Sequence, residues 1–387
     1  MAKSLSVILL LLFFVNAHAV QNKVYKKKRK YTTPTIKVHV SEHPNFEDDL
    51  DFQNMETVLD RQIKRYKRRN LSGSISVGGK LISQKKLLNS LVEFKIEVKK
   101  YKQCLATNLR KGDCLRILNG SIQEKFNVYK PELTDEDPRQ GDKNFTKFTA
   151  YYTPTLKGSN TPSSINQHAI YKLPSDQDLA QSTRRQIDFR GALKNENLEL
   201  FYTSDLFELY NMQVEGGGRV LLPSGKAYYL SYSGTNKQRW NFISKYMLKQ
   251  GMIKNGSIAA QKEFLKLHPE LHEEIYSTCP SYVYFEVSPT QPKGSDLVPL
   301  TNNRSIATDY RHYRLKGMLA FVISKRLNPD SQKVRFKKFS RFMVDQDTGG
   351  AIKGKARVDL YFGEDDYAAR AAQHQNHLGQ LYFLVLK

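Results

Sequence analysis

The most regular hydrophobic pattern of the chain lies near its C-terminus, over residues 356–362. Apolar and polar side chains alternate there, with Ala356, Val358, Leu360 and Phe362 on one face and Arg357, Asp359 and Tyr361 on the other. A period of two residues is typical of an extended strand, so we predict a strand on which Asp359 points away from the apolar layer. The glycines and short polar residues of 347–354 permit tight turns or a close ligand, as at the rim of a cleft. An ordinary surface strand after a loop explains the same residues.

Two amphipathic helices are predicted in the first third of the chain. Apolar residues recur at helical spacing in each, with Met55, Leu59, Ile63 and Tyr66 in the first and Leu87, Leu91, Phe94 and Val98 in the second. Ser83 is a suitable N-cap for the second helix. We interpret both as structural helices that pack against a core.

After Pro138 the pattern changes to short strands, and the most informative of them is 148–154. Its adjacent tyrosines, Tyr151 and Tyr152, face opposite sides of a strand. One of them could offer a flat surface for a sugar ring, although a strand rich in tyrosine also suits simple packing. Residues 155–278 combine strands, glycine turns and helical stretches, which predicts a second compact unit. Short strands return from Tyr282 onward.

The N-terminus has the pattern of a secretory signal peptide over residues 1–19. Lys3 precedes an apolar run, and Ala17-His18-Ala19 forms an A-x-A cleavage site. The apolar run is shorter than the roughly 20 residues of a membrane-spanning helix, so no transmembrane segment is expected. No cysteine follows the cleavage site, and no lipid anchor is predicted. We expect an exported protein that is periplasmic, associated with the outer membrane, or secreted.

The formal net charge of +23 favours an anionic partner. Nucleic acid, anionic lipid headgroups and the anionic polymers of a bacterial envelope all fit this charge, and export argues against nucleic acid. Residues 20–52 include a basic run at 26–30 and are predicted to form a flexible basic arm. Such an arm could associate electrostatically with an anionic envelope surface, although a charge run is also compatible with a merely solvated segment.

The cysteines predict one disulfide. Cys104 and Cys114 lie close enough in sequence to close a short loop, and export supports oxidation. Cys279 lies among apolar residues and is predicted to be a buried, inert thiol. The nine histidines form no spacing typical of a metal site, so neither a metal nor a cofactor is expected.

Five stretches, in order along the chain, resemble the membrane-bound lytic murein transglycosylase A (MltA) family. They are residues 148–154 (FTAYYTP), 213–219 (QVEGGGR), 280–285 (PSYVYF), 298–305 (VPLTNNRS) and 347–359 (DTGGAIKGKARVD). The resemblance covers most of residues 140–387. Three residues depart from it, because members usually have glycine at Ala150 and Gln-Gly-Ser-Gly-Arg at 215–219, where this chain has Glu215 and Gly217 instead of Gln and Ser.

The resemblance implies a mainly β enzyme in which a double-psi β-barrel domain carries the catalytic acid. A second β-barrel-like domain would be inserted into it, with the substrate groove between them. We map the helices and the catalytic domain to 53–154 with 279–387, and the insert to 155–278. The catalytic acid would be Asp359, with Asp347 and Asp366 as neighbouring carboxylates. The implied substrate-binding residues are Thr149, Tyr151, Tyr152, Lys353 and Arg304.

The implied activity is cleavage of the MurNAc-GlcNAc bond of peptidoglycan with formation of a 1,6-anhydromuramyl product. A single Asp would act first as general acid and then as general base, whereas ordinary glycosidases use two carboxyl groups. A non-catalytic peptidoglycan-binding module and a secreted polyanion binder are the alternatives, the latter with steeply salt-dependent binding. We expect a monomer that binds peptidoglycan glycan strands and no nucleic acid.

Overall fold

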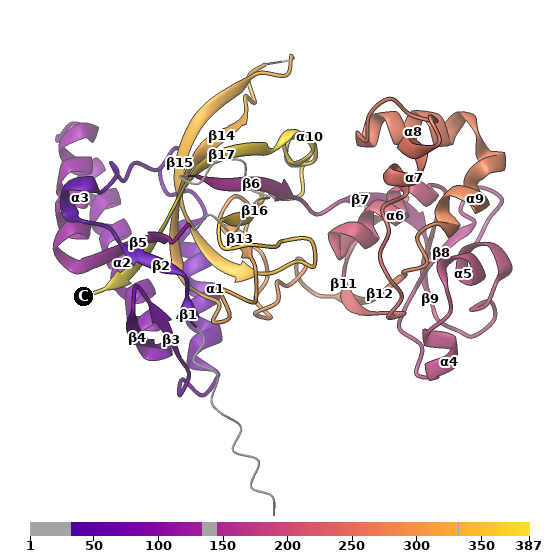
Figure 1. Ribbon diagram of the computed structural model, residues 1–387, viewed down its shortest axis with the longest axis horizontal. Coiled ribbons are helices and arrows are strands. Elements are labelled where there is room, and N and C mark those ends of the chain that lie inside the picture. The colour runs from indigo at the N-terminus through magenta and orange to yellow at the C-terminus, as the bar shows by residue number, and fades with distance from the viewer. Residues whose placement is uncertain (1–31, 134–144, 332) are drawn as a thin grey trace, which may run out of the picture. The chain divides into compact units, whose positions relative to one another are not determined.

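The computed structural model describes residues 32–133, 145–331 and 333–387 (Figure 1). The predicted signal peptide and the beginning of the predicted arm lie outside these ranges. Everything described below belongs to one compact unit, Tyr31–Lys387. Within the described ranges no helix combines the length and the apolar character that crossing a membrane requires.

Six strands close into a barrel. They are β6 (Thr146–Tyr151), β13 (Ser305–Thr308), β14 (Leu319–Leu327), β15 (Phe336–Asp347), β16 (Arg357–Tyr361) and β17 (Asn376–Leu386). The order around the ring is β14-β15-β13-β16-β6-β17, and β17 pairs back with β14. The pairs β13–β15 and β16–β6 are parallel, and the other four are antiparallel. Helix α10 (Asp366–His374) lies between β16 and β17 in sequence.

Strand β16 has the alternation that the sequence predicted. Val358 and Leu360 are fully buried in the core, while Arg357 and Asp359 are partly exposed. Tyr361 departs from the pattern, because it is also fully buried. Its hydroxyl lies 2.6 Å from the hydroxyl of Thr153, so a polar partner compensates the burial of the phenol.

Both predicted helices are present, as α1 (Met55–Lys67) and α2 (Gln84–Leu105), and their predicted apolar faces are buried. Ser83 caps α2 by accepting a hydrogen bond from the Lys86 amide. A third helix, α3 (Lys111–Lys125), was not predicted. Around them lie β1 (Thr32–Thr33), β2 (Thr35–Lys37), η1 (Val40–Glu42), β3 (Ser74–Val77), β4 (Lys80–Ser83) and β5 (Phe126–Pro131).

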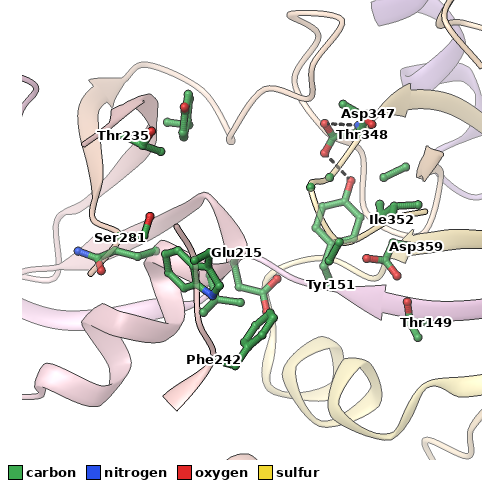
Figure 2. A pocket seen from close by; sticks show the side chains of 18 of the residues that line it. Thr149, Tyr151, Glu215, Thr235, Phe242, Ser281, Asp347, Thr348, Ile352 and Asp359 are labelled. Carbon is green, nitrogen blue, oxygen red and sulfur yellow. Dashed lines mark hydrogen bonds between the residues drawn. The ribbon is translucent and has the colours of Figure 1, made fainter. Parts of the chain in front are cut away.

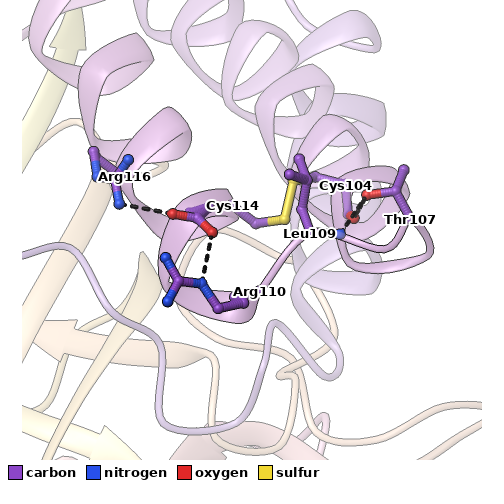
Figure 3. Close-up of a disulfide and its surroundings, with 7 residues drawn as sticks. Cys104, Thr107, Leu109, Arg110, Cys114 and Arg116 are labelled. Atoms are coloured by element: carbon purple, nitrogen blue, oxygen red, sulfur yellow. Dashed lines mark hydrogen bonds and ion pairs between the residues drawn. A yellow bond between two sulfur atoms is a disulfide. The ribbon is translucent and has the colours of Figure 1, made fainter.

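A disulfide between Cys104 and Cys114 joins the end of α2 to the first turn of α3 (Figure 3). The two Cα atoms are 5.7 Å apart. The adjacent Asp113 accepts hydrogen bonds from Arg110 and Arg116, so the start of α3 is held by ion pairs as well as by the covalent bond.

The expectation of a flexible arm over 20–52 is wrong for residues 32–52. Strand β2 pairs with β5, and the rings of Phe46 and Phe52 are buried against Phe342. Asp48 is buried in an ion pair with Arg304. This segment therefore packs on the barrel. Its apolar residues are isolated within a polar stretch, so no periodicity revealed them.

A second, six-stranded sheet has the order β12-β11-β10-β7-β9-β8. Its strands are β7 (Thr155–Ser159), β8 (His168–Tyr171), β9 (Glu199–Thr203), β10 (Gly217–Leu221), β11 (Ala227–Thr235) and β12 (Val283–Ser288). The helices in this part of the chain are α4 (Gln177–Ala180), α5 (Arg184–Arg190), α6 (Leu206–Glu215), α7 (Ile243–Lys249), α8 (Ile258–Leu267), η2 (Pro269–Leu271) and α9 (His272–Ser277). The pairing of β12 with β11 extends the sheet to Ser288, past the expected domain boundary at 278.

Candidate active site

A cavity of about 830 Å³ is lined by both sets of strands. The barrel contributes β6, β16 and the turn that follows β15. The part of the chain that carries the second sheet contributes the end of helix α6, strand β11 and the segment 238–242. Figure 2 shows Thr149, Tyr151, Asp347 and Asp359 on one side, with Thr235, Phe242 and Ser281 on the other. A concave site of this size with convergent polar groups is the usual form of a ligand-binding pocket.

Asp359 lies in the barrel wall of this cavity. The parallel pairing of β16 with β6 places it directly beside Thr149. Burial raises the pKa of its carboxyl to about 6, an effect that Arg357 opposes and Asp347 reinforces. The Arg357 guanidinium is 3.6 Å from Oδ1 of Asp359. Because this pKa is close to neutrality, Asp359 can both give and accept a proton under physiological conditions.

Asp347 is held by three hydrogen bonds. Its Oδ1 accepts from the amides of Ser295 and Thr348, both at 2.8 Å, and its Oδ2 accepts from the Tyr151 hydroxyl at 2.9 Å. Burial raises the pKa of Asp347, and these bonds oppose the rise. Since its lone pairs are engaged, Asp347 orients the Tyr151 ring and adds negative charge near Asp359.

Several polar atoms in the cavity wall lack partners. Oγ1 of Thr149, Oδ1 of Asp359, both amide atoms of Gln213 and Nε1 of Trp240 are buried without a hydrogen bond to any described residue. Buried polar groups are almost always paired in native proteins. A ligand with many hydroxyl groups would satisfy donors and acceptors that are spread over both walls in this way.

Of the predicted site residues, Thr149, Tyr151 and Asp347 share this cavity with Asp359. Arg304 does not, and its assignment as a substrate-binding residue is wrong. Its side chain is fully buried and donates to both carboxylate oxygens of Asp48 and to backbone carbonyls of Gln53 and Phe342. Arg304 therefore anchors the segment before α1 to the barrel.

Tyr152 and Asp366 line a different cavity, of about 380 Å³. Tyr151, the last residue of β6, and Tyr152, the residue after it, do face opposite sides, as the sequence predicted, and only Tyr151 lines the cavity of Asp359. Asp366 begins α10, next to its N-cap Asp365. Lys353 is exposed and does not line the larger cavity. These three positions do not contribute to the site around Asp359.

The sequence prediction missed Glu215, Gln213 and Trp240, which line the wall opposite the barrel. Glu215 and Gln213 lie within a stretch that had been noted for its resemblance, and Trp240 is the single tryptophan of the chain. Burial raises the pKa of the Glu215 carboxyl to about 8, and the negative charge of Asp359 adds to the rise. The cavity therefore contains a second carboxyl group that titrates near neutrality.

The described histidine, cysteine, aspartate and glutamate side chains form no group of three that could hold a metal ion. The only described free cysteine, Cys279, is buried. The side chains that line the cavity offer proton transfer by carboxyl groups, hydrogen bonding, and stacking on aromatic rings.

Comparison with known proteins places the chain in a family. Residues 147–286 match the MltA specific insert domain, and residues 304–385 match the 3D domain. The membrane-bound lytic murein transglycosylase A of Vibrio cholerae is 30% identical over 268 residues, which cover 68% of this chain and 70% of that protein.

Solved structures support the same fold. E. coli MltA with bound chitohexaose superposes with a TM-score of 0.69 at 23% identity, over 92% of this chain and 96% of that one. A membrane-bound lytic murein transglycosylase from Agrobacterium tumefaciens gives 0.69 at 20% identity, over 91% and 97%. The expected mainly β fold, with an inserted second β domain and N-terminal helices, is confirmed. By sequence and by fold, the chain belongs to the membrane-bound lytic murein transglycosylase A family.

Proposed function

We propose that this protein is a lytic transglycosylase that cleaves the β-1,4 bond between MurNAc and GlcNAc of peptidoglycan and leaves a 1,6-anhydromuramyl end. The observation that supports this most strongly is Asp359, a carboxyl group with a pKa of about 6 in a cavity whose buried polar atoms lack partners. The family assignment supplies the substrate class.

In the first step the protonated Asp359 donates its proton to the glycosidic oxygen while the bond from that oxygen to C1 breaks. In the second step the muramyl C6 hydroxyl forms a bond to C1, and the Asp359 carboxylate takes the hydroxyl proton. The acid is thereby regenerated, and no water is consumed. A pKa of about 6 leaves about a tenth of Asp359 protonated at pH 7, which suits both roles.

The neighbours of Asp359 support each half of this cycle. The Asp347 charge favours the protonated acid that the first step needs, and the Arg357 guanidinium favours the carboxylate that the second step needs. Tyr151, oriented by Asp347, and Thr149, beside Asp359 on β6, are proposed to bind the sugar. Asp359 would then be the one residue that exchanges protons with the substrate.

We also propose that the protein is exported and acts on glycan strands in the periplasm. The apolar N-terminal run with its A-x-A site and the charge of +23 support this location and an electrostatic association with the envelope. The catalytic unit would comprise 53–154 with the strands after β12, and the second sheet would form the opposite wall of the groove.

The test is digestion of purified sacculi by the wild-type protein and by Asp359→Asn, with the soluble products identified by mass. We expect 1,6-anhydro ends from the wild type and a loss of activity of at least about a hundredfold in the variant, because an amide cannot exchange the proton. Asp366→Asn is the matched control. Its carboxyl lies in the other cavity, so its activity should be retained.

Digestion in heavy-oxygen water separates the alternatives. Reducing ends labelled with solvent oxygen as the main product would show hydrolysis instead. Binding to sacculi without any release of sugars, equal in the wild type and in Asp359→Asn, would show a binding module.

A further inference from the structure

Glu215 occupies a defined position across the cavity from Asp359. It is the last residue of α6, whose N-terminus is capped by Asp205 and whose end is set by Gly216 at a φ of 74°. A side chain at Gly218 would collide with Met212 of α6, so β10 can begin this close to the helix only with glycine at that position. Figure 2 shows the Glu215 side chain extending from the end of α6 toward the barrel residues. Its carboxyl is therefore presented to the cavity by a rigid element.

Among the described residues, no cation compensates this carboxyl. Burial and the negative charge of Asp359 raise its pKa to about 8, and only the Tyr152 amide opposes them. Of the described residues that line the cavity, Arg357 alone carries positive charge, and its ion pair is with Asp359. The pair Asp359 and Glu215 therefore carries one negative charge at neutral pH, on Asp359.

The other titratable groups around the cavity do not change this assignment. They are Arg357 on β16, Asp347 at the end of β15, Tyr151 at the end of β6 and Tyr232 on β11, together with Tyr152, which follows β6 and lines the other cavity. Burial raises the pKa of Tyr151 and Tyr152 further above 10, so both stay neutral. Asp347 is engaged by three donors. Glu215 is thus the group expected to gain charge on going from neutral to mildly alkaline pH.

Gln213 gives a second, independent indication of a ligand on this wall. Its side chain is 2% exposed, and neither its amide nitrogen nor its amide oxygen has a partner among the described residues. It lines the same cavity as Glu215, two positions earlier on α6. A saccharide that fills the cavity would supply partners to both side chains.

We propose that Glu215 is a substrate-binding residue that donates a hydrogen bond from its carboxylic acid to the saccharide, from the wall opposite Asp359. This inference rests on the proposed function, because it takes a glycan as the ligand. Its consequence is a pH dependence. When Glu215 ionises, its donor is lost and a second negative charge faces the Asp359 carboxylate, so glycan binding weakens.

The experiment measures the binding of chitohexaose by calorimetry between pH 7 and pH 9, where Asp359 is already ionised. For the wild type we expect a constant affinity up to about pH 8 and then a fall that approaches tenfold per pH unit, as for one required proton. Glu215→Gln keeps the shape and the donor but cannot ionise, so its affinity should stay constant over the whole range. Glu208→Gln, on the same helix and lining the other cavity, should behave like the wild type.

Infrared titration supplies a readout that needs no ligand. The wild type should show a protonated carboxyl band that disappears near pH 8 and is missing in Glu215→Gln. Three results would each overturn the inference. Glu215→Gln could show the same pH dependence of binding as the wild type, the wild type could lack this band, or chitohexaose could fail to bind at any pH. Failure of the proposed function has a different signature, namely no anhydro product from sacculi while this pH-dependent binding remains.

Discussion

At the scale of single residues, the site depends on carboxyl groups that are held in an unfavourable environment. Asp359 is buried, has an oxygen without a hydrogen bond and has a carboxylate neighbour, and these conditions raise the free-energy cost of ionising it, which the Arg357 guanidinium at 3.6 Å offsets only in part. The strand pattern predicted which way Asp359 points. The alternation of apolar and polar residues does not show whether residues distant in sequence cover a side chain. The raised pKa of Asp359 and the position of Glu215 in the same cavity could therefore not be predicted from the sequence.

This environment predicts that Asp359→Asn is more stable than the wild type at alkaline pH. The folded-state pKa of about 6 lies above the unfolded value of 3.8, so the folded protein loses stability as the pH rises from about 4 to about 6. The loss is complete above that window. Urea unfolding at pH 8 should therefore show the variant more stable by about 3 kcal/mol, and at pH 4 the difference should nearly vanish. Equal stability of the two proteins at pH 8 would contradict the assigned environment.

At the scale of elements, periodic segments were predictable and irregular ones were not. The faces of α1 and α2 and the alternation of β16 follow the spacing of their apolar residues. Helix α3 was missed, although Cys114, Leu118 and Ile122 recur every four residues and form its buried face. The predicted flexible arm includes residues 46–52, whereas Asp48 and Asp49 of this segment pair with Arg304 and Arg341 of the barrel domain.

The Asp48–Arg304 pair should be a major support of that segment. Both side chains are fully buried, so Asp48→Asn leaves the Arg304 charge without a counterion, and we expect a loss of about 3–5 kcal/mol. Asp60→Asn breaks the more exposed Lys95–Asp60 pair and should cost less than about 1 kcal/mol. Urea unfolding of both variants tests the difference. A similar small loss for both would mean that the buried pair does not hold the segment.

At the scale of the whole molecule, the order of the motifs along the sequence was sufficient to predict the mainly β fold with an insert. Which motif residues meet in space was not predictable, because it depends on strand pairing. Lys353 and Arg304 lie within matching stretches but do not line the cavity, while Gln213 and Glu215 line it from helix α6 of the inserted domain. The large positive charge was evident from the composition, and it affects how the whole protein associates with an anionic surface.

We predict that association with sacculi is strongly salt-dependent, while chitohexaose binding is not. A charge of +23 attracts an anionic wall at long range, and salt above about 0.1 M screens this attraction beyond about 10 Å. A neutral saccharide held by hydrogen bonds lacks this contribution. Pull-down of Asp359→Asn with sacculi at low and high salt, beside calorimetry with chitohexaose, makes the comparison without turnover. Equal salt dependence of the two ligands would exclude a role for net charge in retention at the wall.

The parallel pairing of β16 with β6 has a consequence for how the protein comes to be folded. Asp359 and Thr149 are neighbours across this pair, yet the entire inserted sheet lies between them in sequence. Contacts between such distant segments form slowly, because a long loop must close before any of them is gained. The ring also needs β17, the last strand of the chain, to pair with both β14 and β6. The wall that bears Asp359 is thus completed late, after the C-terminal strand has arrived, and a chain without β17 would lack the closed barrel that holds Asp359.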